Sequence, residues 1–291
     1  MNGELAVAPR DGGVRTDLGE AAGWPEYAAE LRGVLAAVIA ASSVEVLLID
    51  ALALGERLPE ELAWLRNGVA VTPVQAVDLF VEMLGRGTSP FFRLLGADVL
   101  RIEQSWNAVV FLPMTQEVYD ALDDLSDEHL EIQWRRSEPD LLMVEAPVEV
   151  VADEGFWTAV RAAAQSGTTL LQERWAFGVC GSRWFLVTPE NVEEVISEVQ
   201  PRSLVRVAAD PDLRVRLMDR SFTAFTAPLK PGELACHEVP GGVEDEDEVA
   251  EVTGAGFDLF LAGAALDELY AVVPDADGVV RRQWEDPKQF L

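Results

Sequence analysis

Apolar residues recur every three to four positions in the first third of the chain, which is the spacing of helices with one buried face. The stripe of the first predicted helix is Tyr27, Leu31, Val34, Leu35 and Val38. A second helix is predicted by Thr72 as N-cap, Pro73 at the first helical position and Gly85 as the stop. Its predicted apolar face is Val74, Val77, Phe80, Val81 and Leu84. We therefore predict a mainly helical region over residues 21–95, although residues 44–49 fit a strand equally well.

After Gly96, short apolar runs alternate with helical spacing. A strand at 108–112, a helix capped by Thr115 and a half-buried strand at 130–134 follow one another. The same order returns as a strand at 184–187, a helix opened by Thr188 and a strand at 204–207. We interpret this as a weak internal strand–helix–strand repeat over 98–136 and 171–208, and chance similarity between such units is the alternative. The pattern does not decide whether the strands pair in parallel or as hairpins.

The remaining segments complete the predicted organisation. Residues 1–20 carry no periodic pattern and are predicted to be a flexible tail. A strand around 143–151 and a helix after Asp153 join the two repeats, and residues 269–284 read as a hairpin around a Gly-containing turn. The prediction is an α+β fold: a helical N-terminal part, then an α+β region over 96–291 with mixed or antiparallel sheet units.

Charge narrows the range of partners. The chain has 291 residues with 51 Asp and Glu against 22 Lys and Arg, a formal net charge of -29. A field of that sign repels nucleic acid and anionic membrane, so we expect neither as a direct partner. Apolar residues make up 49% of the chain, enough for a globular core. With two cysteines and no signal-peptide pattern, we expect a cytoplasmic protein.

Candidate catalytic and metal-binding residues are few. Cys236 and His237 adjoin, but neighbours in a strand point to opposite faces, so a thiol–imidazole pair is a weak hypothesis. The segment 275–278 resembles the start of a calcium loop, yet the later oxygen ligands are missing and a plain turn fits better. The sequence contains no glycine-rich phosphate loop and no zinc-ligand spacing. We therefore expect no cofactor and no metal.

One stretch is rich in arginine, in contrast to the negative charge of the whole chain. Five arginines lie between residues 202 and 220, and Arg214 and Arg216 alternate with the apolar residues of a predicted strand. With Arg206 they form a candidate face for bidentate binding of a carboxylate or a phosphate. The alternative is a salt-bridged sheet face, because acidic residues lie close by. Arginines also adjoin Trp134, Trp175 and Trp184, an arrangement found both at interfaces and in ordinary surface packing.

Three functional hypotheses follow. The first is a non-catalytic interaction protein, of the immunity, chaperone or regulator type, that presents acidic surface to a basic protein or peptide. The second is an enzyme without a recognisable motif, acting on a peptide or a small metabolite through Cys236 and His237 or through the arginine face. The third is a DNA-mimic inhibitor, which the even spread of acidic residues disfavours. The sequence leans towards a protein without catalysis and leaves the oligomeric state open.

Overall fold

A computed structural model describes residues 2–10, 23–87, 90–104, 109–122, 125, 129–136, 148–178, 180–211, 213, 222–239, 259–262, 269–281 and 284. The chain divides into two compact units, Met1–Met143 and Val144–Leu291. The break predicted near residue 95 is therefore misplaced. Strand β2 (Leu47–Ala53) pairs with β4 (Phe91–Gly96), so the predicted helical region shares one sheet with the strands that follow it.

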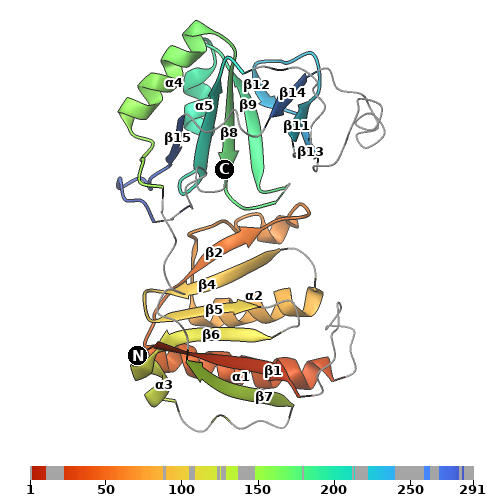
Figure 1. The fold of residues 1–291 in the computed structure, drawn as a ribbon, viewed down its shortest axis with the longest axis vertical. Coiled ribbons are helices and arrows are strands. Elements are labelled where there is room, and N and C mark those ends of the chain that lie inside the picture. The colour runs from red at the N-terminus through yellow and green to blue at the C-terminus, as the bar shows by residue number, and fades with distance from the viewer. Residues whose placement is uncertain are drawn as a thin grey trace. The chain divides into compact units, whose positions relative to one another are not determined.

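Within its described residues, the first unit has one seven-stranded antiparallel sheet in the order β3-β2-β4-β5-β6-β1-β7 (Figure 1). Its remaining strands are β1 (Asn2–Pro9), β3 (Ala70–Val71), β5 (Leu100–Gln104), β6 (Val110–Thr115) and β7 (Leu130–Arg136). The tail predicted over 1–20 is wrong for Asn2–Pro9, because this segment pairs with β6 on one side and β7 on the other. Leu5, Ala6 and Val7 of β1 are all buried, and so short an apolar run shows neither helical spacing nor strand alternation in the sequence.

Helices α1 (Trp24–Ser42) and α2 (Pro73–Arg86) both lie behind the strands of this sheet in Figure 1. A one-turn 3-10 helix, Glu60–Leu62, and the short helix α3 (Gln116–Asp120) complete the unit. The predicted N-cap of α2 is confirmed: Thr72 and Gln75 form a capping box. The predicted stop is two residues early, since Gly85 is helical and Gly87 takes the left-handed conformation that ends the helix.

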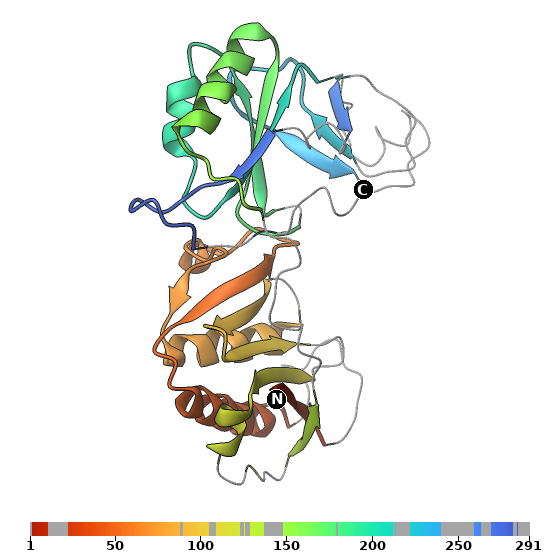
Figure 2. The same ribbon diagram turned by 60° about the vertical axis from the view of Figure 1, so that its left-hand side comes forward.

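In the described part of the second unit, five strands form an antiparallel sheet in the order β12-β9-β8-β10-β15, and three more form a small sheet, β13-β11-β14. The strands are β8 (Thr169–Arg174), β9 (Ser182–Val187), β10 (Leu204–Ala209), β11 (Phe222–Phe225), β12 (Gly232–Leu234), β13 (Cys236–Val239), β14 (Leu259–Ala262) and β15 (Leu269–Val272). Helices α4 (Glu154–Ser166) and α5 (Val192–Glu198) cover one face of the five-stranded sheet (Figure 2). Phe225 of the small sheet packs on Trp184 from the other face.

The two predicted repeat segments share one connection. In the first unit α3 joins β6 to β7, and β1 lies between them, antiparallel to both. In the second unit α5 joins β9 to β10, and β8 lies between them in the same way. The joined strands are therefore parallel to each other across an inserted strand. The inserted strand comes from the start of the chain in one unit and from a hairpin in the other, so the internal repeat stays a prediction.

Two local predictions need correction. The C-terminal hairpin of 269–284 does not form among its described residues: β15 pairs with β10, and Val279–Arg281 carries no strand. The turn itself is present, with Gly278 N–H donating to Asp275 O at 2.8 Å. Thr188 does not cap α5 either, since the helix begins at Val192 after a turn in which Asn191 Oδ1 accepts from Thr188 N–H at 2.7 Å.

The α+β class is confirmed by this combination of helices and antiparallel sheets. The helical character of residues 21–95 holds for α1 and α2, while β2, β3 and β4 fall in the same region. Among the described helices, none combines the length and the apolar composition that crossing a bilayer requires.

Candidate functional site

The first unit carries an apolar groove between α1 and α2, with a volume of about 550 Å³. That volume falls in the range of about 300–1,000 Å³ that is typical of ligand-binding clefts. Its floor and walls come from both helices and from the turn that follows α1. The lining residues are Arg32, Ala36, Ile39, Ala40, Ser43, Val44, Glu45, Pro73, Val74, Val77 and Asp78.

Small side chains on α1 produce the hollow. Ala36 and Ala40 are four residues apart and therefore lie on one face of the helix, where both are exposed. The opposite stripe of α1, which includes Leu35 and Val38, is fully buried. Because alanine side chains end at Cβ, the space beside α1 stays open above the neighbouring helix.

Helix α2 supplies the apolar wall of the groove. Val77 is buried at its base, whereas the side chain of Val74 is 73% exposed. The prediction that Val74 belongs to the core face of α2 is therefore wrong. Val74 lies in the first turn, three residues before Val77, so it projects past the edge of the core. Valine has a low helix propensity, and at this exposed position its side chain buries little surface in the fold. The apolar surface of Val74 is therefore available for binding.

The rim of the groove carries acidic groups. Glu45 is exposed and makes no ion pair among the residues that the structure describes. Asp78 faces Arg32 across the helices at 3.5 Å, and both side chains are well exposed, at 64% and 44%. Such a solvated pair is worth at most about 1 kcal/mol, so it can be displaced by a stronger partner.

The lining of the groove has little catalytic capacity. It contains neither cysteine nor histidine, and its one hydroxyl is Ser43, at the left-handed C-cap of α1. Acyl transfer needs a nucleophile beside a base that is itself oriented. The apolar lining of the groove and the carboxylates of Glu45 and Asp78 at its rim are complementary to an apolar surface with a cationic border.

Of the residues proposed from sequence, two come together in the second unit. Trp184 on β9 and Arg206 on β10 both lie opposite Gln172 of β8, one on each side of it. Tyr270 of β15 extends this row beyond Arg206. The row lies on the face opposite α4 and α5, where Trp184 is buried and Arg206 is half-buried. Arg214 and Arg216 lie outside the described residues, so the arginine face stays a prediction.

The arginines stack on other rings than those predicted. Arg183 lies over Phe185 at 4.8 Å, and Arg174 lies over Phe177 at 4.6 Å. Arg183 and Phe185 are two residues apart in β9 and therefore share a face, which the adjacent Trp184 does not. Arg174 is the last residue of β8, and Phe177 lies in the connection that follows the strand.

The third tryptophan of the proposed set lies in the first unit. Trp134 of β7 stacks on Tyr119 of α3, with 3.8 Å between the ring centroids. Its face is therefore already occupied by an aromatic ring of the same unit, and the residue is half-buried. This contact accounts for the stacked face of Trp134 by packing within the unit, and a role of the residue at an interface stays a prediction.

Cys236 and His237 are consecutive residues of β13, paired with Phe225 and Ala224 of β11. Consecutive positions of a strand belong to opposite faces of a sheet, so the backbone gives no support to a direct thiol–imidazole pair. Cys236 is half-buried and packs against the cluster of Leu170 and Trp184. The thiol hypothesis stays a weak prediction.

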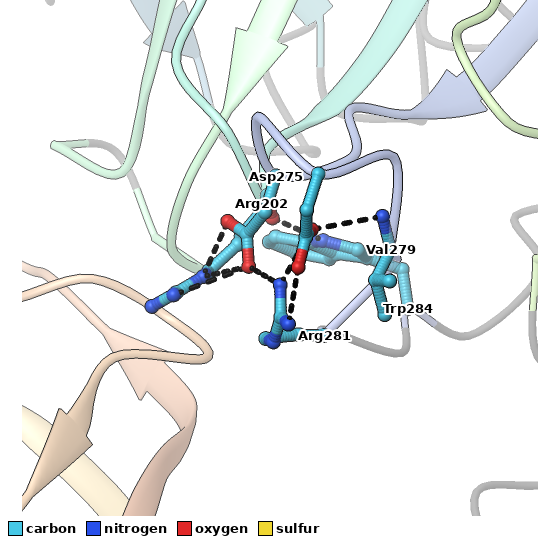
Figure 3. A network of polar contacts seen from close by, with 6 residues as sticks. Arg202, Asp275, Val279, Arg281 and Trp284 are labelled. Atoms are coloured by element: carbon cyan, nitrogen blue, oxygen red, sulfur yellow. Dashed lines mark hydrogen bonds and ion pairs between the residues drawn. The ribbon is translucent and has the colours of Figure 1, made fainter.

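The turn that resembles a calcium loop is closed by arginines (Figure 3). Arg202 Nε donates to Asp275 Oδ1 at 2.9 Å, and Arg281 Nη1 bridges Asp275 Oδ2 and Asp277 Oδ1 at 2.8 Å each. Burial alone would raise the pKa of Asp275, but the hydrogen bonds from Arg202 and Arg281 outweigh it and lower that pKa. The carboxylates of Asp275 and Asp277 are thus neutralised by arginines of the same chain. Arg202 forms a salt bridge within the chain, which is the alternative to a ligand-binding arginine face.

No group of three or more His, Cys, Asp or Glu side chains in the described part of the chain is placed to hold a metal ion. Comparison with protein-family models, with curated proteins and with solved structures gives no significant match.

The sequence did not indicate the groove, because Val74 fits the apolar stripe of the predicted helix. The available clues were the small residues Ala36 and Ala40 and the position of Val74 next to a helix start.

Proposed function

We propose that the protein is a non-catalytic binding protein whose α1–α2 groove takes a basic amphipathic helix of a partner protein. The observation that carries this proposal is the apolar groove itself, with exposed Val74 on its wall and Glu45 and Asp78 at its rim. Helices that lie in such grooves place apolar side chains on the floor at helical spacing. A cationic border on that helix complements the acidic rim.

The charge of the whole molecule acts in the same direction. A net charge of -29 attracts a cationic segment over a Debye length of about 8 Å at physiological salt and speeds its encounter. The apolar floor then holds the segment once it is oriented. Binding is therefore expected to weaken with salt mainly through slower association. A cytoplasmic location, predicted from the cysteine content, belongs to the same proposal.

The direct test uses a defined probe. A fluorescent synthetic helix with leucines at helical spacing and lysines on its flanks is titrated with the protein, and binding is followed by anisotropy. An acidic counterpart with glutamates in place of lysines is the matched peptide. We expect the basic helix to bind saturably and the acidic one not to bind.

Two variants assign the binding to the groove. Val74→Ser removes exposed apolar surface and is expected to weaken binding by about tenfold, because each methylene removed from water contributes about 0.8 kcal/mol. Val279→Ser is the matched control, since Val279 is also exposed, at 48%, but lies in the second unit. If both variants bind the probe as the unmodified protein does, the groove is not the binding site.

A further inference from the structure

The edge strand β7 is self-complementary, and we infer that it pairs with β7 of a second copy of this chain to form a symmetric dimer. Among the described residues, β7 is the last strand of the seven-stranded sheet, and β1 is its one neighbour in the sheet. An edge strand presents backbone N–H and C=O groups that another strand can bind. This inference does not depend on the α1–α2 groove.

The sequence of β7 separates its two faces. Glu131, Gln133 and Arg135 are exposed and lie on the face away from the helices, while Ile132 and Trp134 are half-buried on the helix side. The exposed side chains already bind one another: Gln133 Nε2 donates to Glu131 Oε1 at 2.5 Å and Arg135 Nη2 donates to Gln133 Oε1 at 3.3 Å. The strand thus carries an acid at one end and a base at the other.

A two-fold axis through Gln133 brings these groups into register. In an antiparallel pair centred there, Glu131 of each copy lies opposite Arg135 of the other, and Ile132 lies opposite Trp134. The outer face then gains two ion pairs and the helix face gains two apolar pairs. In this register Leu130 lies opposite position 136 at each end of the pair.

Other registers lose this match. Centring the pair on Ile132 sets Glu131 opposite Gln133, and centring it on Trp134 sets Gln133 opposite Arg135. A shift by a single residue would put outer-face side chains opposite helix-face ones, which the continuous sheet does not allow. Charge complementarity therefore selects both the partner, which is a second copy, and the register.

The neighbouring strand reinforces the outer row. Glu4 of β1 lies directly opposite Arg135 on β7. Arg135 would then lie between Glu4 of its own chain and Glu131 of the second copy. Alternation of acid and base across adjacent strands favours pairing, whereas like charges directly opposite one another oppose it.

Sedimentation velocity on the full chain, over micromolar to submillimolar concentrations and at near-physiological salt, tests the charge pairs. We expect a concentration-dependent dimer for the unmodified protein. Arg135→Glu sets two carboxylates opposite each other and should weaken the dimer by about tenfold or more. The double variant Glu131→Arg/Arg135→Glu reverses both charges and should restore most of the affinity, with a residual loss because Glu4 then faces a carboxylate on β7. Arg161→Glu, which changes the net charge equally on helix α4, is the control and should dimerise normally.

Cross-linking tests the register. In a Cys180→Ala/Cys236→Ala background, Gln133→Cys places two thiols at the two-fold axis and should form an intermolecular disulfide under mild oxidation. Glu131→Cys should not, because its counterpart lies four residues further along the paired strand. The inference is overturned if the unmodified protein stays monomeric throughout, if the double variant is no better than Arg135→Glu, or if both cysteine variants cross-link equally.

Discussion

At the scale of single residues, the buried carboxylate of Glu173 on β8 is held by three hydrogen bonds. Its side chain is fully buried, and Arg183 Nε donates to its Oε2 at 2.7 Å. Its other oxygen accepts from Gln200 N–H at 2.7 Å and from Ser203 Oγ at 2.9 Å. Glu173 therefore ties the loop between α5 and β10 to the middle of the sheet.

Removing this carboxylate leaves three donors without their acceptor. We predict that Glu173→Ala lowers the free energy of unfolding by about 3 kcal/mol, as expected when one partner of a buried ion pair is lost. Glu154→Ala is the control, because the Glu154 side chain is 80% exposed and its pair with Arg161 contributes below about 1 kcal/mol. Urea unfolding followed by circular dichroism measures both. Equal effects would show that Glu173 has no special role.

The pKa of Asp277 tests the contacts between the turn at residues 275–278 and Arg281 (Figure 3). Hydrogen bonds from Arg281, and then from Val279 N–H, lower the pKa of Asp277 to about 2. This pKa lies below the unfolded value of about 3.9, so the interaction stabilises the fold above that pH and is lost as the pH falls towards 2. Arg281→Gln is predicted to raise the pKa of Asp277 back towards its ordinary value. Carboxyl carbon NMR titration measures the shift, and an unchanged pKa would contradict the assignment.

At the scale of elements, two glycines show how local geometry decides the effect of one substitution. Gly33 lies within α1, and a Cβ at this position would meet no atom within 4 Å. Gly181 lies in the connection between β8 and β9, where a Cβ would be 2.4 Å from the backbone oxygen of Ala176. Trp175 and Ala176 both donate their N–H to Gly181 O in this tight connection.

A glycine-to-alanine substitution is therefore predicted to change the free energy of unfolding in opposite directions at these two positions. Gly33→Ala should raise the free energy of unfolding by about 0.5–1 kcal/mol, through the lower entropy of the unfolded chain. Gly181→Ala should lower it by about 1–3 kcal/mol, since the backbone has to move. Thermal unfolding of the two variants side by side is the measurement. A stabilising Gly181→Ala would contradict the geometry of this connection.

Elements with strong local signatures could be predicted from the sequence. The cap of α2 at Thr72, the helix after Asp153 and the alternation in β7 all appear in the structure. Strand β1 could not be predicted, because its partners β6 and β7 lie about a hundred residues away and its place depends on those contacts. The prediction of a C-terminal hairpin was wrong for the same reason. Strand β15 pairs with β10, which is distant in the sequence, and not with the segment that follows β15.

The candidate groove depends on tertiary structure even more strongly. Periodicity assigns Val74 to the apolar stripe of α2, and it cannot show that the buried part of this helix begins only at Ala76 and Val77. Nor does it show that Ala36 and Ala40 of α1 face the same space as Val74. Which apolar residue stays exposed is decided by the neighbouring helix, so this information is absent from any single segment.

At the scale of the whole molecule, the net charge of -29 favours a basic partner, and we propose that this partner binds in the groove. Arginines in the described part are largely engaged with acids of the same chain, as in the pairs Arg202–Asp275 and Arg183–Glu173. Surface acids such as Glu45 remain for an external cation.

Hydrogen–deuterium exchange with and without the basic helical probe tests whether a basic amphipathic helix binds between α1 and α2. We expect slower exchange in the segments 36–45 and 73–78, which line the groove, and unchanged exchange in α4 and β8 of the second unit. Saturating probe with no protection in either groove segment, or with protection confined to the second unit, would contradict it.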